Sequence, residues 1–110
     1  MNRRNVVRKA DIFIHKMKAG LLSESDDREY YTFEYLKDYD GPPLSVAVPV
    51  SEEPYTYKIF PPFFEGLLPE GTNLEALLGH QNIDRKDYFT QLITVGTNLV
   101  GAVTVEEHHE

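Results

Sequence analysis

Two glycines spaced as in a phosphate-binding loop are the clearest candidate for chemistry in this sequence, and they bound the segment Gly96–Gly101. Such a loop needs a lysine and then a serine or threonine after the second glycine, because the ammonium group binds phosphate and the hydroxyl binds magnesium. Ala102 and Val103 occupy those two positions. We therefore expect a helix cap followed by a turn into a strand, and we predict no cofactor site.

Two groups of side chains carry donor atoms for a metal ion but lack the arrangement that a metal site needs. His108 and His109 are adjacent near the chain end, without partners that would orient their rings, so we expect a frayed tail. The other group consists of four carboxylates: Glu24, Asp26, Asp27 and Glu29. Their spacing does not match a calcium loop, and we expect a solvated turn. No metal site is predicted.

Nucleophiles for covalent catalysis are also missing from the sequence. There is no cysteine, which excludes disulfides and thiolate chemistry and agrees with a reducing compartment such as the cytoplasm. The serines lie in no nucleophile elbow. No run approaches the ~20 apolar residues of a membrane span, so we predict no membrane partner. We predict that the chain has no catalytic residue and is not an enzyme.

Charge is distributed unevenly along the 110 residues. Eighteen acidic residues against eleven basic ones give a net charge of −7, and six of the basic residues fall within the first eighteen. An acidic body repels a phosphate backbone, so we expect a basic partner surface in place of duplex DNA. The alternative is an accessory nucleic-acid contact through four residues of the N-terminal arm: Arg3, Arg4, Arg8 and Lys9.

The length and the 41% hydrophobic content predict a single domain with one core. We place this domain at residues 11–105, between a basic arm of residues 1–10 and a flexible tail of residues 106–110. The first half predicts an antiparallel meander. Its strands are Asp11–Lys16 and Leu21–Glu24, with a turn at Ala19-Gly20, and then Tyr30–Leu36, in which alternate aromatic residues share one face.

A proline-bounded run, Leu44–Val48, predicts a fourth short strand, and residues 51–58 read as a loop with at most a short extended piece. A β-branched strand, Leu99–Val105, closes the chain. The fold class predicted is therefore α+β, an antiparallel sheet formed by the meander plus a C-terminal strand, with a cluster of about three short helices inserted before the last strand.

The first predicted helix is indicated by apolar residues at helical spacing, and Pro69 ends it. These residues are Phe60, Phe63, Phe64, Leu67 and Leu68. The second begins with a Thr72 to Glu75 capping box, buries three leucines and ends at Gly79. Those leucines are Leu74, Leu77 and Leu78. The third runs from a cap at Asp84 through Thr94 to an exit at Gly96. Its inward residues are Leu92, Ile93 and either Tyr88 or Phe89.

Adjacent phenylalanines and adjacent leucines cannot all face one narrow stripe, so part of this apolar surface is expected to bind a partner. The predicted partner-binding residues surround the end of the first helix and the turn that follows. They are Phe63, Phe64, Leu67, Leu68, Glu70, Thr72 and Asn73.

Three segments in the right order together resemble the N-terminal subdomain of HipA-type kinases, the toxins of bacterial toxin–antitoxin modules. These segments are Pro43–Pro49, Phe63–Glu70 and Gly96–Val103, and the similarity runs from about Ile12 to Val105. A HipA-type kinase continues for several hundred residues that carry its ATP site and catalytic aspartate. None of those positions exists here, so the resemblance transfers no catalytic residue.

A stand-alone N-terminal subdomain resembles the small subunits, termed HipS, of three-component HipBST modules. This resemblance implies non-covalent docking onto a HipT-like kinase and restraint of its activity, with a helix-turn-helix HipB-like protein completing the complex. DNA would be contacted only indirectly, through that complex. Three alternatives remain open: a structural subunit that links kinase and repressor without inhibiting, an accessory nucleic-acid-binding protein, or a fragment of a full-length kinase.

Overall fold

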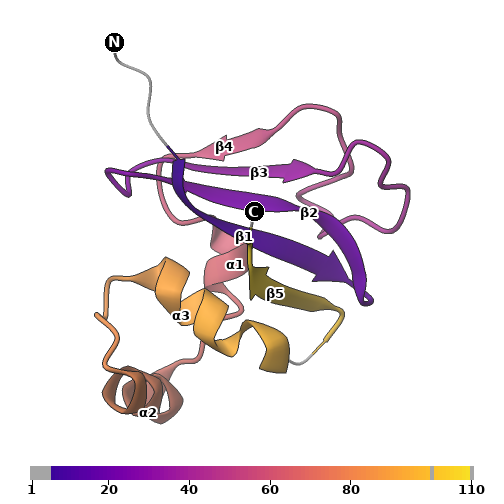
Figure 1. Ribbon diagram of the computed structural model, residues 1–110. Coiled ribbons are helices and arrows are strands. Elements are labelled where there is room, and N and C mark those ends of the chain that lie inside the picture. Colours follow the sequence, from indigo (N-terminus) through magenta and orange to yellow (C-terminus); the bar gives the residue numbers. More distant parts are fainter. Residues whose placement is uncertain (1–5, 100, 110) are drawn as a thin grey trace.

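The computed structural model describes residues 6–99 and 101–109, which form one antiparallel sheet with helices on one of its faces (Figure 1). The strands lie in the order β4-β3-β2-β1-β5. Their bounds are β1 Val6–Ile14, β2 Met17–Ser25, β3 Tyr31–Tyr35, β4 Tyr55–Tyr57 and β5 Val103–Glu107. Three α-helices and a 3-10 turn precede the last strand. Their bounds are α1 Pro62–Glu65, α2 Gly71–Gln81, α3 Tyr88–Val95 and η1 Gly96–Asn98. The predicted fold class is confirmed.

The hairpin of β1 and β2 turns earlier than the sequence predicted. Its turn is formed by His15 and Lys16, which have positive φ angles of 51° and 68°. The predicted turn at Ala19-Gly20 is wrong, because both residues belong to β2. A Cβ atom at Gly20 would lie 2.5 Å from the carbonyl oxygen of Glu34. Glycine is therefore present here so that β2 and β3 can approach closely, and not to reverse the chain.

Alternation along β3 produces the aromatic centre of the core, as predicted. Tyr31, Phe33 and Tyr35 are all buried on the face that α1 and α3 cover. The Phe33 ring packs edge-on against Tyr35, with centroids 4.9 Å apart, and against Phe64 of α1 at 5.8 Å. Edge-on and tilted aromatic pairs of this kind add to the stability that burial alone provides.

The segment between β3 and β4 differs from its prediction. Residues 44–48 form no strand; Ser45 and Val48 make a single isolated bridge, and the side chain of Val46 is 98% exposed. The fourth strand is instead β4, in the segment that was expected to be a loop, and it pairs antiparallel with β3. The alternating pattern thus belongs to a proline-bounded turn whose two ends, Leu44 and Val48, are buried as on the inner face of a strand, while Val46 between them is exposed.

The last strand begins at Val103, four residues after its predicted start at Leu99, and it ends two residues after its predicted end at Val105. β5 extends to Glu107 and pairs antiparallel with β1. The predicted flexible tail is therefore wrong for residues 106–108, since the backbone N–H of His108 also donates to Lys9 at 3.0 Å. Its ring nitrogen Nδ1 lies 2.7 Å from the Asp11 carboxylate. Within the described ranges, every helix is too short or too polar to cross a bilayer.

Candidate partner-binding surface

Helix α1 is a single turn that anchors the predicted binding region to the sheet. Pro62 stands at its first position, where a missing N–H costs nothing, and the chain continues in tight turns to Leu68. Phe64 is fully buried against β3 and Leu68 is buried beside it. Phe63 is half-buried and packs edge-on against Phe64, with centroids 5.3 Å apart. The apolar spacing therefore identified mainly core residues.

Helix α2 follows an extended Glu70 and begins at Gly71, whose φ is +59°. The predicted capping box is wrong, because the helix starts at Gly71 and no side chain caps it. Glu75 instead forms a surface ion pair with Arg85 at 2.8 Å. The helix also runs past Gly79 to Gln81, where Asn82 takes the left-handed conformation that ends it.

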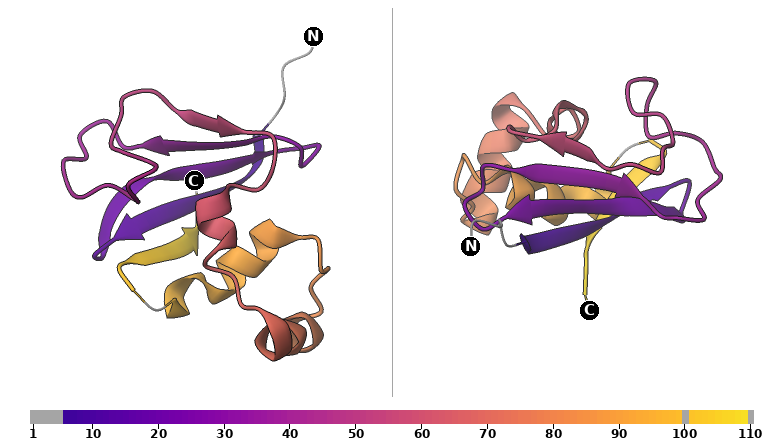
Figure 2. Two further views of the ribbon diagram at one scale, coloured as in Figure 1. Left: turned by 180° about the vertical axis from the view of Figure 1, so that it is seen from behind. Right: turned by 90° about the horizontal axis from the view of Figure 1, so that it is seen from above.

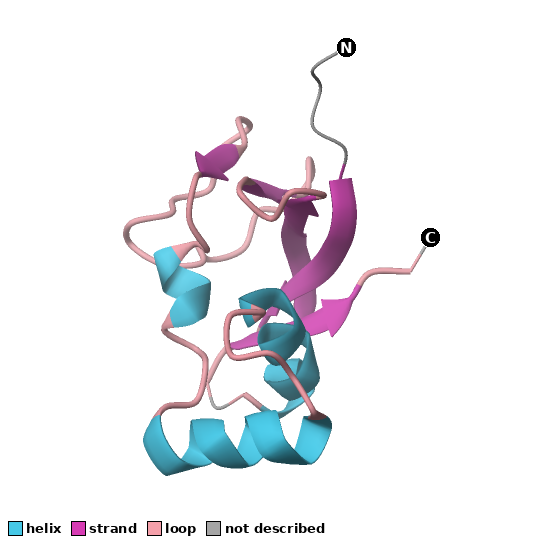
Figure 3. Ribbon diagram, turned by 90° about the vertical axis from the view of Figure 1, so that its left-hand side faces the viewer, coloured by secondary structure: helices cyan, strands magenta, loops and turns pink. Residues whose placement is uncertain are grey.

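No residue of α2 is buried, although the sequence predicted a buried leucine stripe. Leu74, Leu77 and Leu78 are each only half-buried, and the other face of the helix is exposed. Figure 3 shows α2 lying crosswise at the edge of the molecule, away from the sheet. A helix that buries so little apolar surface has a large free face for a partner.

An open groove of about 430 Å³ lies where α1, the following turn, α2 and the start of α3 meet. Leu68, Leu74 and the half-exposed ring of Tyr88 supply apolar walls, while Glu65 and Glu70 supply carboxylates. The groove therefore combines an apolar lining with negative charge, which suits a partner side chain that is apolar and flanked by basic groups.

The seven predicted partner-binding residues fall into three classes in the structure. Phe64 and Leu68 are core residues. Phe64 is fully buried, whereas Leu68 also lines the groove, so a contact with a partner stays a prediction for Leu68. Phe63 and Leu67 are half-buried. The exposed members are Glu70, Thr72 and Asn73, which cluster at the start of α2.

Leu68 and Glu70 are the predicted contacts that line the groove, and the other groove residues were not predicted as contacts. Those that lie beyond the predicted segment are Leu74, Tyr88 and Gln91. Helical phase gave no signal for Tyr88, because it lies three and four positions before Gln91 and Leu92, which are both buried. Its ring is nevertheless 37% exposed at the first position of α3. Tyr88 packs at 5.5 Å from the Phe60 ring, and this contact holds it beside the groove.

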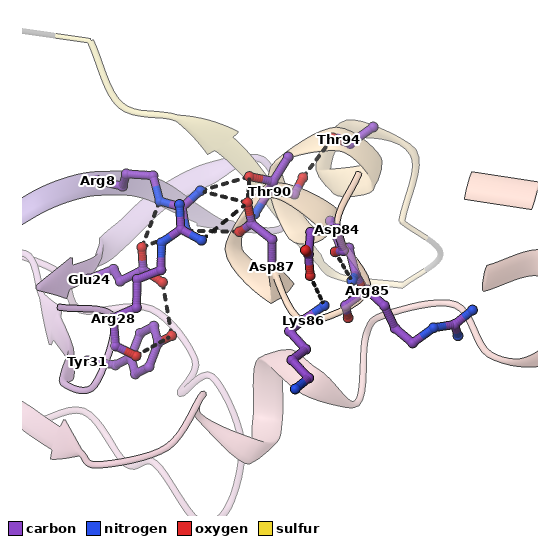
Figure 4. Close-up of polar contacts among 11 residues, drawn as sticks. Arg8, Glu24, Arg28, Tyr31, Asp84, Arg85, Lys86, Asp87, Thr90 and Thr94 are labelled. Atoms are coloured by element: carbon purple, nitrogen blue, oxygen red, sulfur yellow. Dashed lines mark hydrogen bonds and ion pairs between the residues drawn. The ribbon is translucent and has the colours of Figure 1, made fainter. Parts of the chain in front are cut away.

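A cluster of ionic side chains fastens α3 to the first hairpin (Figure 4). Arg8 of β1 donates from Nε to Glu24 at 2.7 Å and from Nη2 to Asp87 at 2.9 Å. Asp87 is also the cap of α3, accepting from the backbone N–H of Thr90 at 3.2 Å. Tyr31 donates its hydroxyl to Glu24 at 2.9 Å. This cluster joins residues up to 82 positions apart and is structural in character.

Three predictions are corrected by this cluster. Glu24 was expected in a solvated turn but is only 2% exposed, with Arg8 and Tyr31 as partners. Arg8 was a candidate nucleic-acid contact, yet its guanidinium is committed to Glu24 and Asp87. Lys9 lies half-buried in β1, and Arg3 and Arg4 lie outside the described residues. The predicted cap at Asp84 is likewise replaced by Asp87.

The environment of the cluster shifts its protonation equilibria. Burial alone raises the pKa of Asp87, but hydrogen bonds from Arg8 and Thr90 outweigh that effect and lower the pKa below its ordinary value. Burial, reinforced by the bond to Glu24, raises the pKa of the Tyr31 hydroxyl. Asp87 is therefore held as a carboxylate and Tyr31 as a neutral donor at neutral pH.

The glycine segment near the chain end has a packing role. A Cβ atom at Gly96 would lie 2.1 Å from the carbonyl oxygen of Val105, so α3 can meet β5 only through glycine. Across residues 6–99 and 101–109, no three histidine or acidic side chains gather closely enough to hold a metal ion.

Comparison with known proteins decides the family. The HipA N-terminal domain family matches residues 10–106. The chain belongs to this family. A solved structure of the N-terminal domain of HipA toxin superposes with a TM-score of 0.74 at 29% sequence identity, covering 98% of this chain and 99% of that chain.

Two relatives of this HipA N-terminal domain protein differ greatly in length. An uncharacterized protein of Haemophilus influenzae is 36% identical over 107 residues, which cover 97% of this chain and 99% of the relative. A putative kinase of Sinorhizobium fredii, Y4dM, is 33% identical over 94 residues. That match covers 77% of this chain but 23% of the kinase, so the chain spans less than a quarter of that relative.

Proposed function

We propose that this HipA N-terminal domain protein is an antitoxin-type regulatory subunit, equivalent to HipS. In this proposal it binds a HipA-like (HipT) Ser/Thr kinase toxin non-covalently and inhibits it, within a complex that includes a helix-turn-helix DNA-binding partner. The relatives support this: the same unit spans nearly all of one relative of similar size and a minor part of a kinase. A domain of this family is therefore compatible with two arrangements: a segment of a kinase chain, or a separate protein that binds a kinase.

The observation that carries the proposal is the exposed, weakly packed helix α2 beside an acidic groove. Glu70, just before the helix, and Thr72 and Asn73 in its first turn are exposed to solvent. These side chains can accept and donate hydrogen bonds without disturbing the core, because none of them belongs to it. Glu70 adds negative charge that steers a basic partner surface toward the groove.

Inhibition requires only that this surface occupy the kinase near its nucleotide cleft. A kinase must close its lobes to bring nucleotide and substrate together, and a docked domain that resists closure lowers the rate without a covalent step. In our proposal the turn from Pro69 to Asn73 lies at that cleft, while α1 holds the turn rigidly on the sheet.

Co-expression with the cognate HipT-like kinase tests the proposal. The wild-type chain should restore growth and suppress kinase autophosphorylation, whereas a variant with alanine at Glu70, Thr72 and Asn73 should bind at least about tenfold more weakly and fail to rescue. A matched control with alanine at Glu53 and Thr56, which are exposed on and beside β4, should behave as wild type. Full rescue by the triple variant would refute the site; no binding by the wild type would refute the function.

A second candidate, a structural subunit that links kinase and repressor without inhibiting, draws support from exposed apolar side chains at the opposite end of the molecule, Leu36 and Val50. The same experiment separates the two functions. A structural subunit would copurify with the kinase and leave its toxicity unchanged. The nucleic-acid alternative is weakened, because Arg8 is engaged within the fold.

A further inference from the structure

A second hollow of about 720 Å³ lies at the other end of the molecule from α2, where β2 and β3 meet the segment of residues 36–54. Both views in Figure 2 place this segment and α2 at opposite ends. We refer to this hollow as the loop pocket. Six of the residues that line it define its character: Leu21, Glu34, Leu36, Tyr39, Val50 and Glu52.

Hydrogen bonds from tyrosine hydroxyls hold the walls of the loop pocket in place, although residues 36–54 have little regular secondary structure. The Tyr35 hydroxyl accepts from the Leu44 N–H at 2.8 Å and donates to the carbonyl of Val48. The Tyr39 ring stacks on Tyr35 with centroids 5.7 Å apart, and its hydroxyl donates to Pro42 at 2.5 Å. A pocket held this way is formed before a ligand arrives, which lowers the entropy lost on binding.

The loop pocket exposes apolar side chains that the fold does not need to expose. Leu36 is 39% exposed and Val50 is 43% exposed, and both face the same hollow. Each is next to a buried or half-buried neighbour, so neither belongs to a mobile chain end. Apolar groups gathered in a preformed concave site favour an apolar side chain as the occupant.

Charge around the loop pocket is strongly one-sided. Residues 34–54 contain five acidic side chains and one basic side chain, Lys37. Glu34, Glu52 and Lys37 line the hollow itself, and all three are exposed, so carboxylates outnumber the single ammonium group there. Carboxylates at the rim of an apolar site attract cationic groups and repel acidic ones. The complementary occupant is an apolar side chain with positive charges on both sides.

We infer that the loop pocket is a second docking site, which binds a segment of a partner protein that carries a large apolar side chain flanked by lysine or arginine. This site is independent of the α1–α2 surface proposed for the kinase. A chain with two such sites at opposite ends can hold two partners at once, since neither occupant blocks the other.

Nuclear magnetic resonance titration of the full chain tests this inference. Three hexapeptides serve as probes: a leucine-phenylalanine pair flanked by lysines, the same pair flanked by glutamates, and a peptide of lysine and serine only. The first should shift the backbone amides of Leu36, Lys37 and Val50 in a saturable way, and the other two should not. Val50→Asp should weaken binding at least about tenfold, because it introduces a carboxylate into the apolar wall.

Val46→Asp is the matched control, since Val46 lies in the same segment, is 98% exposed and does not line the hollow. It should bind the first peptide as wild type does. Equal binding of the acidic peptide, or shifts that map elsewhere, would overturn the inference. Self-association that Val50→Asp abolishes would also overturn it, because the occupant would then be a second copy of the chain. Val50→Asp should leave kinase inhibition intact, so the two proposals can fail separately.

Discussion

Helices α2 and α3 are separated by only six residues, yet they are attached to the fold in opposite ways. Helix α3 buries Phe89, Gln91 and Leu92, and its cap, Asp87, is tied to β1 through Arg8. Helix α2 buries no residue and has no side-chain cap. The comparison shows that the sheet, α1 and α3 provide the stability of the fold. Surface residues of α2 can therefore change with little loss of folding free energy.

The largest expected effect tests the stable side of this comparison. Phe33→Ala should lower the free energy of unfolding by about 3–5 kcal/mol, because it removes a fully buried ring that contacts Tyr35 and Phe64. Urea denaturation followed by circular dichroism measures the change. Phe63→Ala removes the same side chain from a half-buried site and should cost clearly less. Equal losses of unfolding free energy in the two variants would show that burial does not determine the cost of truncation at these positions.

The next effect concerns the link between α3 and β1. Asp87→Ala should destabilise the protein by about 2–3 kcal/mol, since it removes the helix cap and leaves the Arg8 guanidinium with one carboxylate in place of two. Thermal unfolding measures this loss. The matched control, Glu75→Ala, breaks a fully exposed ion pair with Arg85 and should leave the melting temperature unchanged.

The same aspartate predicts a pH dependence whose sign is fixed. Because the pKa of Asp87 is lower in the folded state than its ordinary value of 3.8, its contribution is present above that value and is lost as pH falls through the folded pKa. The difference in unfolding free energy between wild type and Asp87→Asn should therefore shrink from pH 6 to pH 3. A difference that stays constant over this range would show that the carboxylate charge contributes nothing.

Truncation of one leucine on each helix should give a smaller effect on α2 than on α3. Leu78→Ala on α2 should cost about 1 kcal/mol or less, whereas Leu92→Ala on α3 should cost about 2–5 kcal/mol, because Leu92 is fully buried and Leu78 is not. Chemical denaturation of the two variants gives a direct comparison. Similar values would mean that α2 is fastened as firmly as α3.

The smallest effect is a gain in stability on α2. A Cβ atom at Gly79 would meet no atom within 4 Å, and glycine in a helix interior costs roughly 0.5–1 kcal/mol relative to alanine. Gly79→Ala should therefore stabilise α2 by about that amount. Amide hydrogen exchange should slow several-fold in α2 and remain unchanged in α3. No slowing in α2 would show that its exchange is not controlled by helix opening.

The sequence was sufficient where a local pattern and the tertiary packing agree. Alternation along β3 identified its buried face, because period two places every second side chain on one side of a strand. Prediction from the sequence failed where a tertiary contact determined the role of a residue. Gly20 was taken for a turn, yet it lies in β2 because Phe33 and Glu34 approach it closely. Leu44–Val48 was taken for a strand, yet Tyr35 fastens it as a turn.

The predicted binding surface could not be divided into buried and exposed residues from the sequence, for a related reason. Helical spacing correctly showed that residues 60–68 would place apolar groups on one face, but spacing alone cannot say whether that face meets a sheet or solvent. The structure buries Phe64 and Leu68 in the core and leaves Glu70, Thr72 and Asn73 exposed. The candidate surface therefore consists of these exposed polar residues beside a groove whose apolar walls include Leu68.

By itself, the sequence determined the α+β class, the HipA N-terminal resemblance and the acidic character of the body, since these depend on composition, local periodicity and short motifs. Only the tertiary structure decided that Arg8 is an internal ion-pair partner and that α2 is left with a free face. The physical reason is distance along the chain: Arg8 meets Asp87 across 79 positions, and no local pattern specifies such a pairing.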